Sequence, residues 1–161
     1  MIERTLVLLK PEAVQRHIIG KIISRFENTG LKIVGMKQIW VDKEFAKRHY
    51  FDVAERHGEQ ILKQLADYFT QGPVIAIVLE GSSAVENVRK LVGPTEPKAC
   101  LPGTIRGDFC HGSYKNFDSK KTAVRNVIHA SSNKKEAEQE IKLWFKKEEI
   151  YSYKTINDFC M

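Results

Sequence analysis

The sequence predicts an α+β sandwich of the ferredoxin-like βαββαβ type, with helices packed on an antiparallel four-stranded sheet and additional helices outside that pattern. Three observations support this fold class. Four short apolar runs are typical of strands, the segments between them repeat apolar residues at helical spacing, and the two kinds of element alternate along the chain. The chain has 161 residues, 42% of them hydrophobic, so we expect a single domain over residues 1–161 with a substantial core.

The first three elements are marked by apolar patterning and by residues that end strands and helices. Residues 4–10 form a compact apolar run that ends at Pro11, which predicts a strand. Residues 19–26 place apolar side chains on one face of a helix. Residues 31–41 are typical of a second strand, which we expect to bend near Gly35.

The middle of the chain predicts two helices followed by the strongest strand. Asp42 is positioned to cap a short helix, and residues 61–69 carry the apolar spacing of a second one. The nearly unbroken apolar run over 73–80 predicts a strand buried on both faces. A further helix ends at Gly93, with Ser82 or Ser83 as its N-cap.

The last third contains a long segment without sustained periodicity. Residues 93–121 are rich in glycine and proline, and such long loops in compact domains are usually functional or disordered. Residues 123–129 predict the fourth strand. Ser132 or Asn133 then opens a final helix that extends to about Phe145.

Charge and cysteine content restrict the possible partners and location. Lys and Arg number 26 against 20 Asp and Glu, a net charge of +6 that suits phosphates, nucleotides or nucleic acid without choosing among them. The longest apolar run, 74–79, is far below the roughly 18 residues of a membrane span, so we expect no membrane partner. Cys100, Cys110 and Cys160 are odd in number and lack CxxC spacing, which predicts a cytoplasmic protein without a disulfide framework.

A phosphate ligand would have to be held by side chains, because the sequence has no GxxxxGK[ST] motif and no GxGxxG after a strand. Arginine is well suited to this task because its planar fork makes bidentate bonds to phosphate oxygens. Ordinary solvated surface is the alternative for any one of these residues taken alone. The candidates are Lys10, Arg89, Thr95, Arg106, Arg125 and Asn126.

Among the five histidines, His129 is the candidate for chemistry. It stands at the end of a predicted strand, where catalytic groups are often held by a rigid scaffold. Taken alone, its position favours a structural histidine in a cap or in the core. No HxH or HExxH spacing links the histidines, so we expect no dedicated metal site.

Several segments together resemble the nucleoside diphosphate kinase family over roughly residues 3–151. The stretches NVIHAS, at residues 126–131, and PGTIRGDF, at residues 102–109, carry most of the likeness. The remaining matches are Lys10-Pro11-Glu12, Arg25-Phe26-Glu27, His49-Tyr50, Gly72-Pro73-Val74, Gly93-Pro94-Thr95 and the helix from Ala137 through Glu140 to Phe145.

The resemblance implies an enzyme that moves the γ-phosphoryl group of a nucleoside triphosphate, usually ATP, to a nucleoside diphosphate. Transfer would proceed by a ping-pong mechanism through phosphohistidine, which maintains the nucleotide pools. It also implies Mg²⁺ as cofactor, carried by the nucleotide phosphates, and a homo-oligomer, with a hexamer favoured over a tetramer.

The resemblance also assigns roles to individual residues. His129 would be the nucleophile, Glu140 would orient its imidazole, and Tyr50 would support its surroundings. The nucleotide would be bound by Lys10, Arg89, Thr95, Arg106 and Asn126, and Gly58 occupies the position of a base-stacking phenylalanine.

The chain departs from the family at four places. Gly58 cannot stack on a base, so either His57 replaces the phenylalanine or stacking is weak. Ser132 stands where the family has an aspartate close to the phosphates, although Ser131 keeps a hydroxyl. The segment 111–122 contains an insert of about ten residues, for which we expect a surface excursion. It also contains a second His-Gly-Ser, which we reject as the active site because His111 lacks the flanking strand and helix.

Two other functions remain open at this point. The altered base site and the lysines of the insert are compatible with a nucleotide- or nucleic-acid-binding regulator that has little catalysis. A histidine phosphocarrier that donates to a protein is the third possibility. Retention of His129, Lys10, Arg106 and Asn126 favours the active kinase, with nucleic acid as a secondary partner at most.

Overall fold

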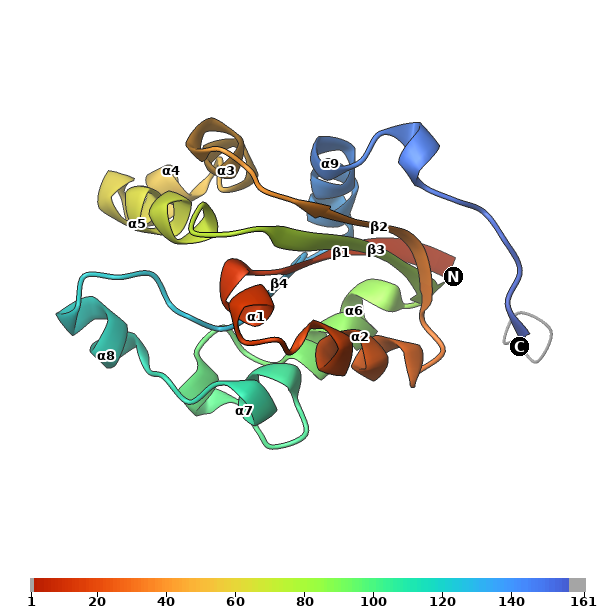
Figure 1. The fold of residues 1–161 in the computed structure, drawn as a ribbon, viewed down its shortest axis with the longest axis horizontal. Helices are drawn as coiled ribbons and strands as arrows, with labels where there is room; N and C mark the ends of the chain where they lie inside the picture. Colours follow the sequence, from red (N-terminus) through yellow and green to blue (C-terminus); the bar gives the residue numbers. More distant parts are fainter. Residues whose placement is uncertain (1, 157–161) are drawn as a thin grey trace.

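The sheet is antiparallel and four-stranded, with strand order β2-β3-β1-β4. In the computed structural model, which describes residues 2–156, the strands are β1 (Ile2–Leu9), β2 (Lys32–Ile39), β3 (Val74–Ser82) and β4 (Ile128–Ala130). Cys160 lies outside the described residues. The element order and the antiparallel sheet confirm the predicted ferredoxin-like class (Figure 1).

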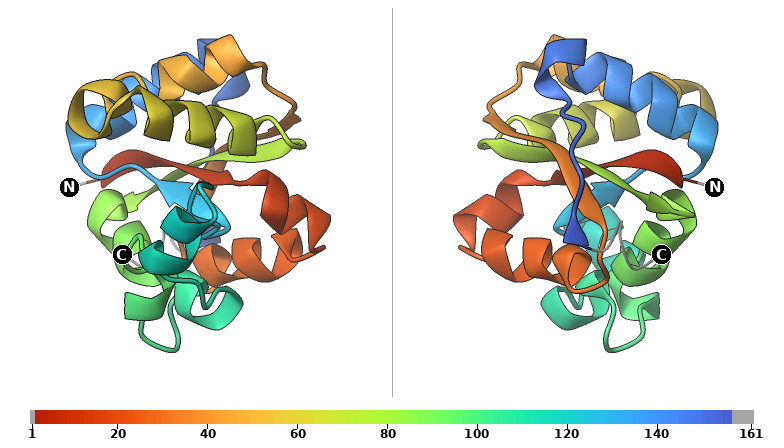
Figure 2. Two further views of the ribbon diagram at one scale, coloured as in Figure 1. Left: turned by 90° about the vertical axis from the view of Figure 1, so that its left-hand side faces the viewer. Right: turned by 90° about the vertical axis from the view of Figure 1, so that its right-hand side faces the viewer.

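Helices cover both faces of the sheet. One layer contains α3 (Lys43–His49), α4 (Val53–His57), α5 (Glu59–Phe69) and α9 (Lys134–Trp144), and the opposite layer contains α1 (Pro11–Gln15), α2 (Ile19–Glu27) and α6 (Ala84–Val92) (Figures 1 and 2). Three short elements lie beyond α6: a 3-10 turn at Pro97–Ala99, α7 (Ile105–Phe109) and α8 (Tyr114–Ser119). A second 3-10 turn, Lys147–Glu149, follows α9.

Strand β1 divides the core into two halves. Successive side chains of a strand point to opposite faces, so Leu6 and Leu8 join the cluster under α3, α5 and α9, while Val7 and Leu9 join the cluster under α2 and α6. All four side chains are fully buried. A central strand with both faces covered therefore runs directly toward the site described below.

Several local expectations are confirmed. The Asp42 carboxylate accepts a hydrogen bond from the Phe45 N–H, and the Asn133 side chain caps α9 through the Glu136 N–H. The pairing of β2 with β3 shifts register between Ile33 and Gly35, where a bend was expected. Strand β3 is buried on both faces over its first six residues.

Three expectations are wrong in detail. The segment 123–129 is not a strand; β4 covers only Ile128–Ala130, because a tight turn precedes it. Two helices were expected after Asp42, but the structure has three, α3, α4 and α5. The break between α4 and α5 lies at Gly58, whose φ is +87°. The segment 93–121 is ordered as short helices that are held mainly by caps and side-chain bonds, which apolar periodicity does not reveal.

No helix in the described range, residues 2–156, combines the length and the apolar character needed to cross a bilayer. This agrees with the shortness of the apolar runs in the sequence.

The short helix α7, which carries Arg106, depends on a glycine. A Cβ added to Gly107 would lie 2.1 Å from the Leu101 carbonyl oxygen, so Gly107→Ala must displace backbone. We expect it to lower the free energy of unfolding by roughly 1–3 kcal/mol. Gly20→Ala is the matched control: its Cβ meets nothing within 4 Å, and it should raise stability by roughly 0.4–1 kcal/mol. Urea unfolding of both variants tests this, and equal stabilities would contradict it.

Candidate active site

A cavity of about 580 Å³ lies beyond the end of β1, between the α3–α5 layer, α6 and the first turn of α9. It brings together eight of the nine site residues predicted from the sequence, although they come from segments far apart in the chain. The eight are Lys10, Tyr50, Arg89, Thr95, Arg106, Asn126, His129 and Glu140. Gly58, at the junction of α4 and α5, is not among the lining residues, and its role stays a prediction.

His129 owes its position to the pairing of β4 with β1. It lies opposite Leu8 in the antiparallel ladder, and residues paired in this way project to the same face of a sheet. Leu8 belongs to the core half under α3, α5 and α9. The imidazole therefore meets side chains of α3 and α9 rather than those of α2 and α6.

A strained turn directly precedes His129. The Ile128 N–H donates to the Asn126 carbonyl at 2.7 Å, and Val127 between them has a φ of +58°. This γ-turn geometry is uncommon, and a positive φ is particularly unfavourable for a β-branched residue. Its buried neighbours hold it in place: Val127 is fully buried, and its carbonyl accepts the Lys10 N–H at 2.8 Å. Strain of this kind is typical of functional sites, and here it turns Asn126 into the cavity.

Lys10 and Asn126 form a buried polar chain along one wall. The Lys10 ammonium donates to Asn126 Oδ1 at 2.7 Å, and Asn126 Nδ2 donates to the Thr95 carbonyl at 2.9 Å. Lys10 is only 5% exposed. Burial, followed by repulsion from Arg106, lowers the pKa of Lys10 to about 7. The cavity therefore holds a lysine that is ready to gain a proton when an anion arrives.

Arg106 is anchored by backbone carbonyls. Its two terminal nitrogens donate to Gly93 O at 2.8 Å and Ile128 O at 2.7 Å, which fixes the plane of the guanidinium. Burial lowers its pKa to about 10, so it remains charged at neutral pH. Its Nε is buried and has no hydrogen-bond partner among residues 2–156. Arg89, from the last turn of α6, adds a further cation to the lining.

Glu140 connects His129 to the core. One of its oxygens lies 2.7 Å from His129 Nε2, and the other accepts the Ser131 hydroxyl at 2.5 Å. Ser131 is fully buried, and Glu140 is nearly so. Burial raises the pKa of Glu140, opposed by His49 and the Ser131 bond. A carboxylate held in this way fixes the orientation of the imidazole and favours the tautomer with its proton on Nε2.

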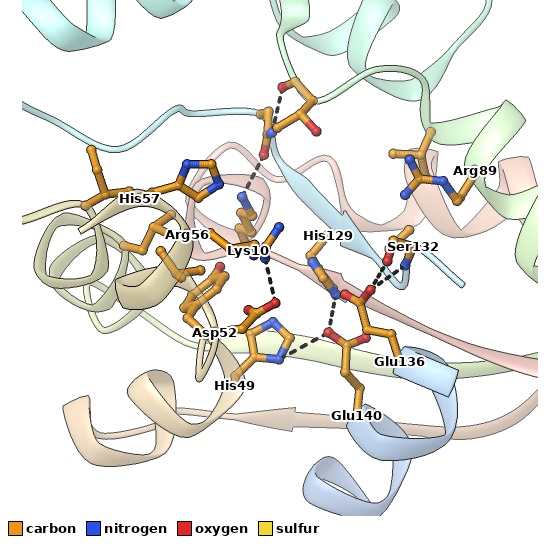
Figure 3. Close-up of a pocket in the computed structure, with 18 of the residues that line it drawn as sticks. Lys10, His49, Asp52, Arg56, His57, Arg89, His129, Ser132, Glu136 and Glu140 are labelled. Atoms are coloured by element: carbon orange, nitrogen blue, oxygen red, sulfur yellow. Dashed lines mark hydrogen bonds and ion pairs between the residues drawn. The ribbon is translucent and has the colours of Figure 1, made fainter. Parts of the chain in front are cut away.

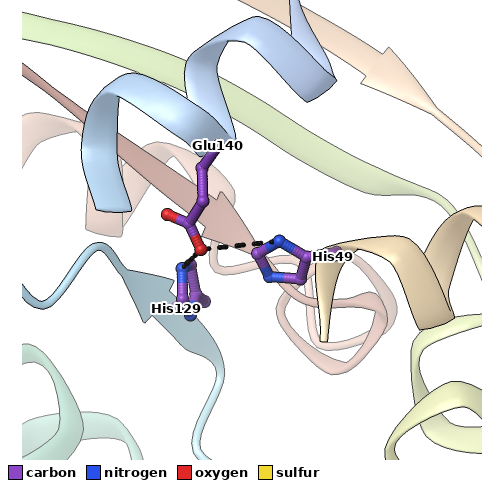
Figure 4. Close-up of side chains that lie close together, drawn as sticks. All are labelled: His49, His129 and Glu140. Carbon is purple, nitrogen blue, oxygen red and sulfur yellow. Dashed lines mark ion pairs between the residues drawn. The ribbon is translucent and has the colours of Figure 1, made fainter. Parts of the chain in front are cut away.

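His49 lies beside this pair, so two imidazoles face one carboxylate (Figure 4). Its Nδ1 is 3.5 Å from Glu140 and accepts the Trp144 indole N–H at 3.3 Å, which leaves the proton on Nε2. The three side chains have the donor types of a metal site. However, the nitrogen of each histidine that faces Glu140 already has a protein partner, so we assign the group to hydrogen bonding.

The surroundings keep His129 neutral. Burial and the nearby cations Lys10, Arg106 and Arg89 hold the pKa of His129 below its usual value of 6.5. Burial and His129 itself likewise lower the pKa of His49. An imidazole without a proton on one nitrogen has a lone pair available, so the arrangement provides a nucleophile at neutral pH.

The sequence analysis missed some of the lining residues (Figure 3). Glu136, in the first turn of α9, brings a carboxylate back to Ser132 by accepting its N–H at 3.2 Å and its hydroxyl. The N-cap pattern before α9 could have indicated this contact, because carboxylates often occupy a first helical turn. Tyr114 enters from the 111–122 insert, and no sequence pattern placed it at the site.

Two further residues need comment. Tyr50 is buried at the cavity wall, and its hydroxyl has no partner within the described part of the chain, so it is available to a ligand. Arg125, also considered for phosphate, lies elsewhere: it donates to Gln71 Oε1 and stacks over Tyr68.

A neutral imidazole held by a carboxylate, next to buried Lys and Arg side chains that can bind phosphate, has the chemistry that phosphoryl transfer requires. Comparison with known proteins makes this specific. The family model described as Nucleoside diphosphate kinase matches residues 3–150, and the chain belongs to that family.

Relatives and solved structures agree with this assignment. The nucleoside diphosphate kinase of Pyrococcus furiosus is 54% identical over 94% of this chain and 88% of its own length. That of Borreliella burgdorferi is 46% identical over 99% and 96%. A structure of the Borrelia burgdorferi enzyme, described as a transition state mimic with bound vanadate and ADP, has a TM-score of 0.94 at 45% identity and covers 98% of this chain and 95% of that one. An NDP kinase from Pyrobaculum aerophilum has a TM-score of 0.88 at 36% identity, covering 94% and 100%.

The environment of His129 makes a prediction about its titration. Because its pKa is lowered in the folded state, the imidazole should stay neutral at pH 6, and stability should fall as the pH drops below 6.5, where the unfolded chain binds the extra proton. Nitrogen chemical shifts of the ring, followed by NMR through an acid titration, measure this directly. A midpoint at or above 6.5 would contradict it.

Proposed function

We propose that this enzyme transfers the γ-phosphoryl group of a nucleoside triphosphate, with ATP as the usual donor, to a nucleoside diphosphate by way of phosphorylated His129. The observation that carries the proposal is the contact of His129 with Glu140 beside the buried Lys10, Asn126 and Arg106. Such a cycle replaces one difficult transfer by two easier ones and gives ping-pong kinetics.

Nδ1 of His129 is the proposed nucleophile. Glu140 occupies Nε2, which leaves the Nδ1 lone pair for the γ-phosphorus. A P–N bond forms while the bond from phosphorus to the bridging β-phosphate oxygen breaks, and the nucleoside diphosphate leaves. The second half-reaction reverses these events with a different diphosphate. Glu140 offsets the positive charge that develops on the ring, so it acts as the positioning residue.

The proposed phosphate ligands are Lys10, Arg89, Thr95, Arg106 and Asn126, with the Tyr50 hydroxyl as an additional donor. Phosphoryl transfer needs positioning and charge stabilisation more than covalent chemistry. Lys10 and Arg106, which are held by hydrogen bonds, would meet that need together with Arg89. The buried Arg106 Nε and Tyr50 hydroxyl would gain partners when phosphate oxygens enter.

Mg²⁺ is the proposed cofactor, and it would neutralise phosphate charge during transfer. Carboxylates are its preferred protein ligands. In the cavity, Asp52 is paired with Arg56, Glu136 with Ser132, and Glu140 with Ser131 and His129. This donor set fits an ion held mainly by the nucleotide phosphates and water, rather than by a protein cage.

Three further features rest on the resemblance or the composition. We propose one kinase domain over the whole chain and a homo-oligomer, with a hexamer favoured over a tetramer. The cytoplasmic location inferred from the cysteines also remains a proposal. The regulator alternative is not favoured, because a binding protein has no chemical need for an oriented nucleophile.

Labelling with γ-³²P-ATP and Mg²⁺, followed by excess GDP, tests the proposed function. We expect acid-labile, alkali-stable label on the wild-type protein that leaves when GDP is added. His129→Ala should abolish it, which corresponds to a loss of at least about 10³-fold in activity because the covalent route is removed. Label that stays with the protein after GDP addition would favour a phosphocarrier, and the absence of label would favour a binding protein.

His111→Ala is the matched control, since His111 belongs to the second His-Gly-Ser of the chain and lies outside the cavity lining. It should label like the wild type. If His129→Ala still labelled while His111→Ala did not, the assignment of the nucleophile would be wrong.

The lowered pKa of Lys10 predicts proton uptake on nucleotide binding. At pH 8 a lysine with a pKa of about 7 is mostly neutral, and an adjacent phosphate raises that pKa, so ADP binding should take up close to one proton. Calorimetry in buffers of different ionisation enthalpy measures the number. Lys10→Met should remove this uptake and weaken binding at least tenfold; the same uptake in both proteins would contradict the prediction.

A further inference from the structure

The cavity has two chemically different ends. Around His129, Lys10 and Arg106 it is cationic, as phosphates require. Away from these residues it is lined by side chains of α4 and α5 and by Tyr114 of α8. The α4 and α5 side chains are the apolar Val53, Ile61 and Leu65 and the polar Arg56 and His57. A nucleotide that fills the cationic end with its phosphates must direct its sugar and base toward the other end.

Tyr114 is accessible at the end of the cavity that is lined by α4, α5 and α8. It is 43% exposed, whereas Tyr50, on the cavity wall, is 9% exposed and packs against His49 and Phe69. Its phenol is also near enough to influence the charge of Arg106. The residue therefore lines the cavity with part of its surface accessible to a planar ligand.

The insert is docked so that Tyr114 has a fixed position. The Tyr114 N–H donates to Glu96 Oε1 at 2.9 Å, and the Gly112 carbonyl accepts the Lys98 N–H at 2.9 Å. Both contacts are with the segment that follows Thr95. A Cβ at Gly112 would lie 2.4 Å from the tip of the Phe117 ring, so these two residues pack closely. The excursion expected from the sequence is thus tied to the loop that carries phosphate ligands.

The opposite wall does not supply an equivalent aromatic ring from Gly58. That residue has no side chain and does not line the cavity; α4 and α5 present Val53, Ile61 and Leu65 together with Arg56 and His57. A base placed against Val53, Ile61 and Leu65 would have its second face toward α8. Stacking of a base on an aromatic side chain tolerates any base, because every base has a π face.

We propose that Tyr114 of the insert is a nucleotide-binding residue whose ring stacks on the base of the bound nucleotide, opposite the cavity wall formed by α4 and α5. This rests on the proposed function. The insert then provides one wall of the base site, and the discrimination between bases stays low because no base edge is read by the stacking ring.

The test compares ligands with and without a base. Affinities of the wild type, Tyr114→Ala and Tyr114→Phe are measured by calorimetry for ADP and for inorganic pyrophosphate, both with Mg²⁺. Tyr114→Ala should weaken ADP binding about 5- to 100-fold, the range that alanine substitution of stacking residues gives. Its affinity for pyrophosphate should be unchanged, and Tyr114→Phe should bind both ligands like the wild type.

Lys115→Ala is the matched control from the same helix, because Lys115 is exposed and does not line the cavity. It should bind both ligands normally. The inference fails if Tyr114→Ala keeps wild-type ADP affinity, if it loses ADP and pyrophosphate equally, or if Tyr114→Phe is as weak as Tyr114→Ala. Failure of the wild type to bind ADP or to take up label would instead overturn the proposed function.

Discussion

The pairing of the three-residue strand β4 with the end of β1 is the interaction on which the rest of the site depends. It sets His129 opposite Leu8, and the adjoining bond from the Lys10 N–H to the Val127 carbonyl continues the same ladder. His129 and Lys10 therefore lie on two paired segments of backbone at one edge of the sheet. The strained turn at Val127 persists because this pairing and the burial of Val127 leave it no alternative.

Burial has opposite consequences for the different charged groups of the cavity. It lowers the pKa of Lys10 and His129, and it raises that of Glu140. Each shift favours the neutral form while no ligand is bound. In the proposed function, incoming phosphates would reverse this balance for the lysine, so part of the binding energy would be coupled to proton uptake, whereas the histidine would stay neutral.

The fold also explains how one chain tolerates an insert beside its active site. Segment 111–122 leaves the core after α7 and returns before the turn at Asn126, so its length does not disturb the β1–β4 pairing. Its contacts to Glu96 and Lys98 fix it to the loop that carries Thr95. An insertion at such a point can add a wall to a ligand site without changing the residues that hold phosphate.

The sequence by itself determined the fold class, the family and eight of the residues that line the cavity. Apolar periodicity reports which face of an element is buried, and the NVIHAS and PGTIRGDF stretches identified His129, Asn126 and Arg106. Only the tertiary structure decided the details that depend on contacts between distant segments. These include the three-residue length of β4, the return of a carboxylate to Ser132 through Glu136, and the position of Tyr114 at the cavity. The physical reason is that such contacts depend on strand register, caps and side-chain hydrogen bonds, none of which leaves a periodic pattern in the sequence.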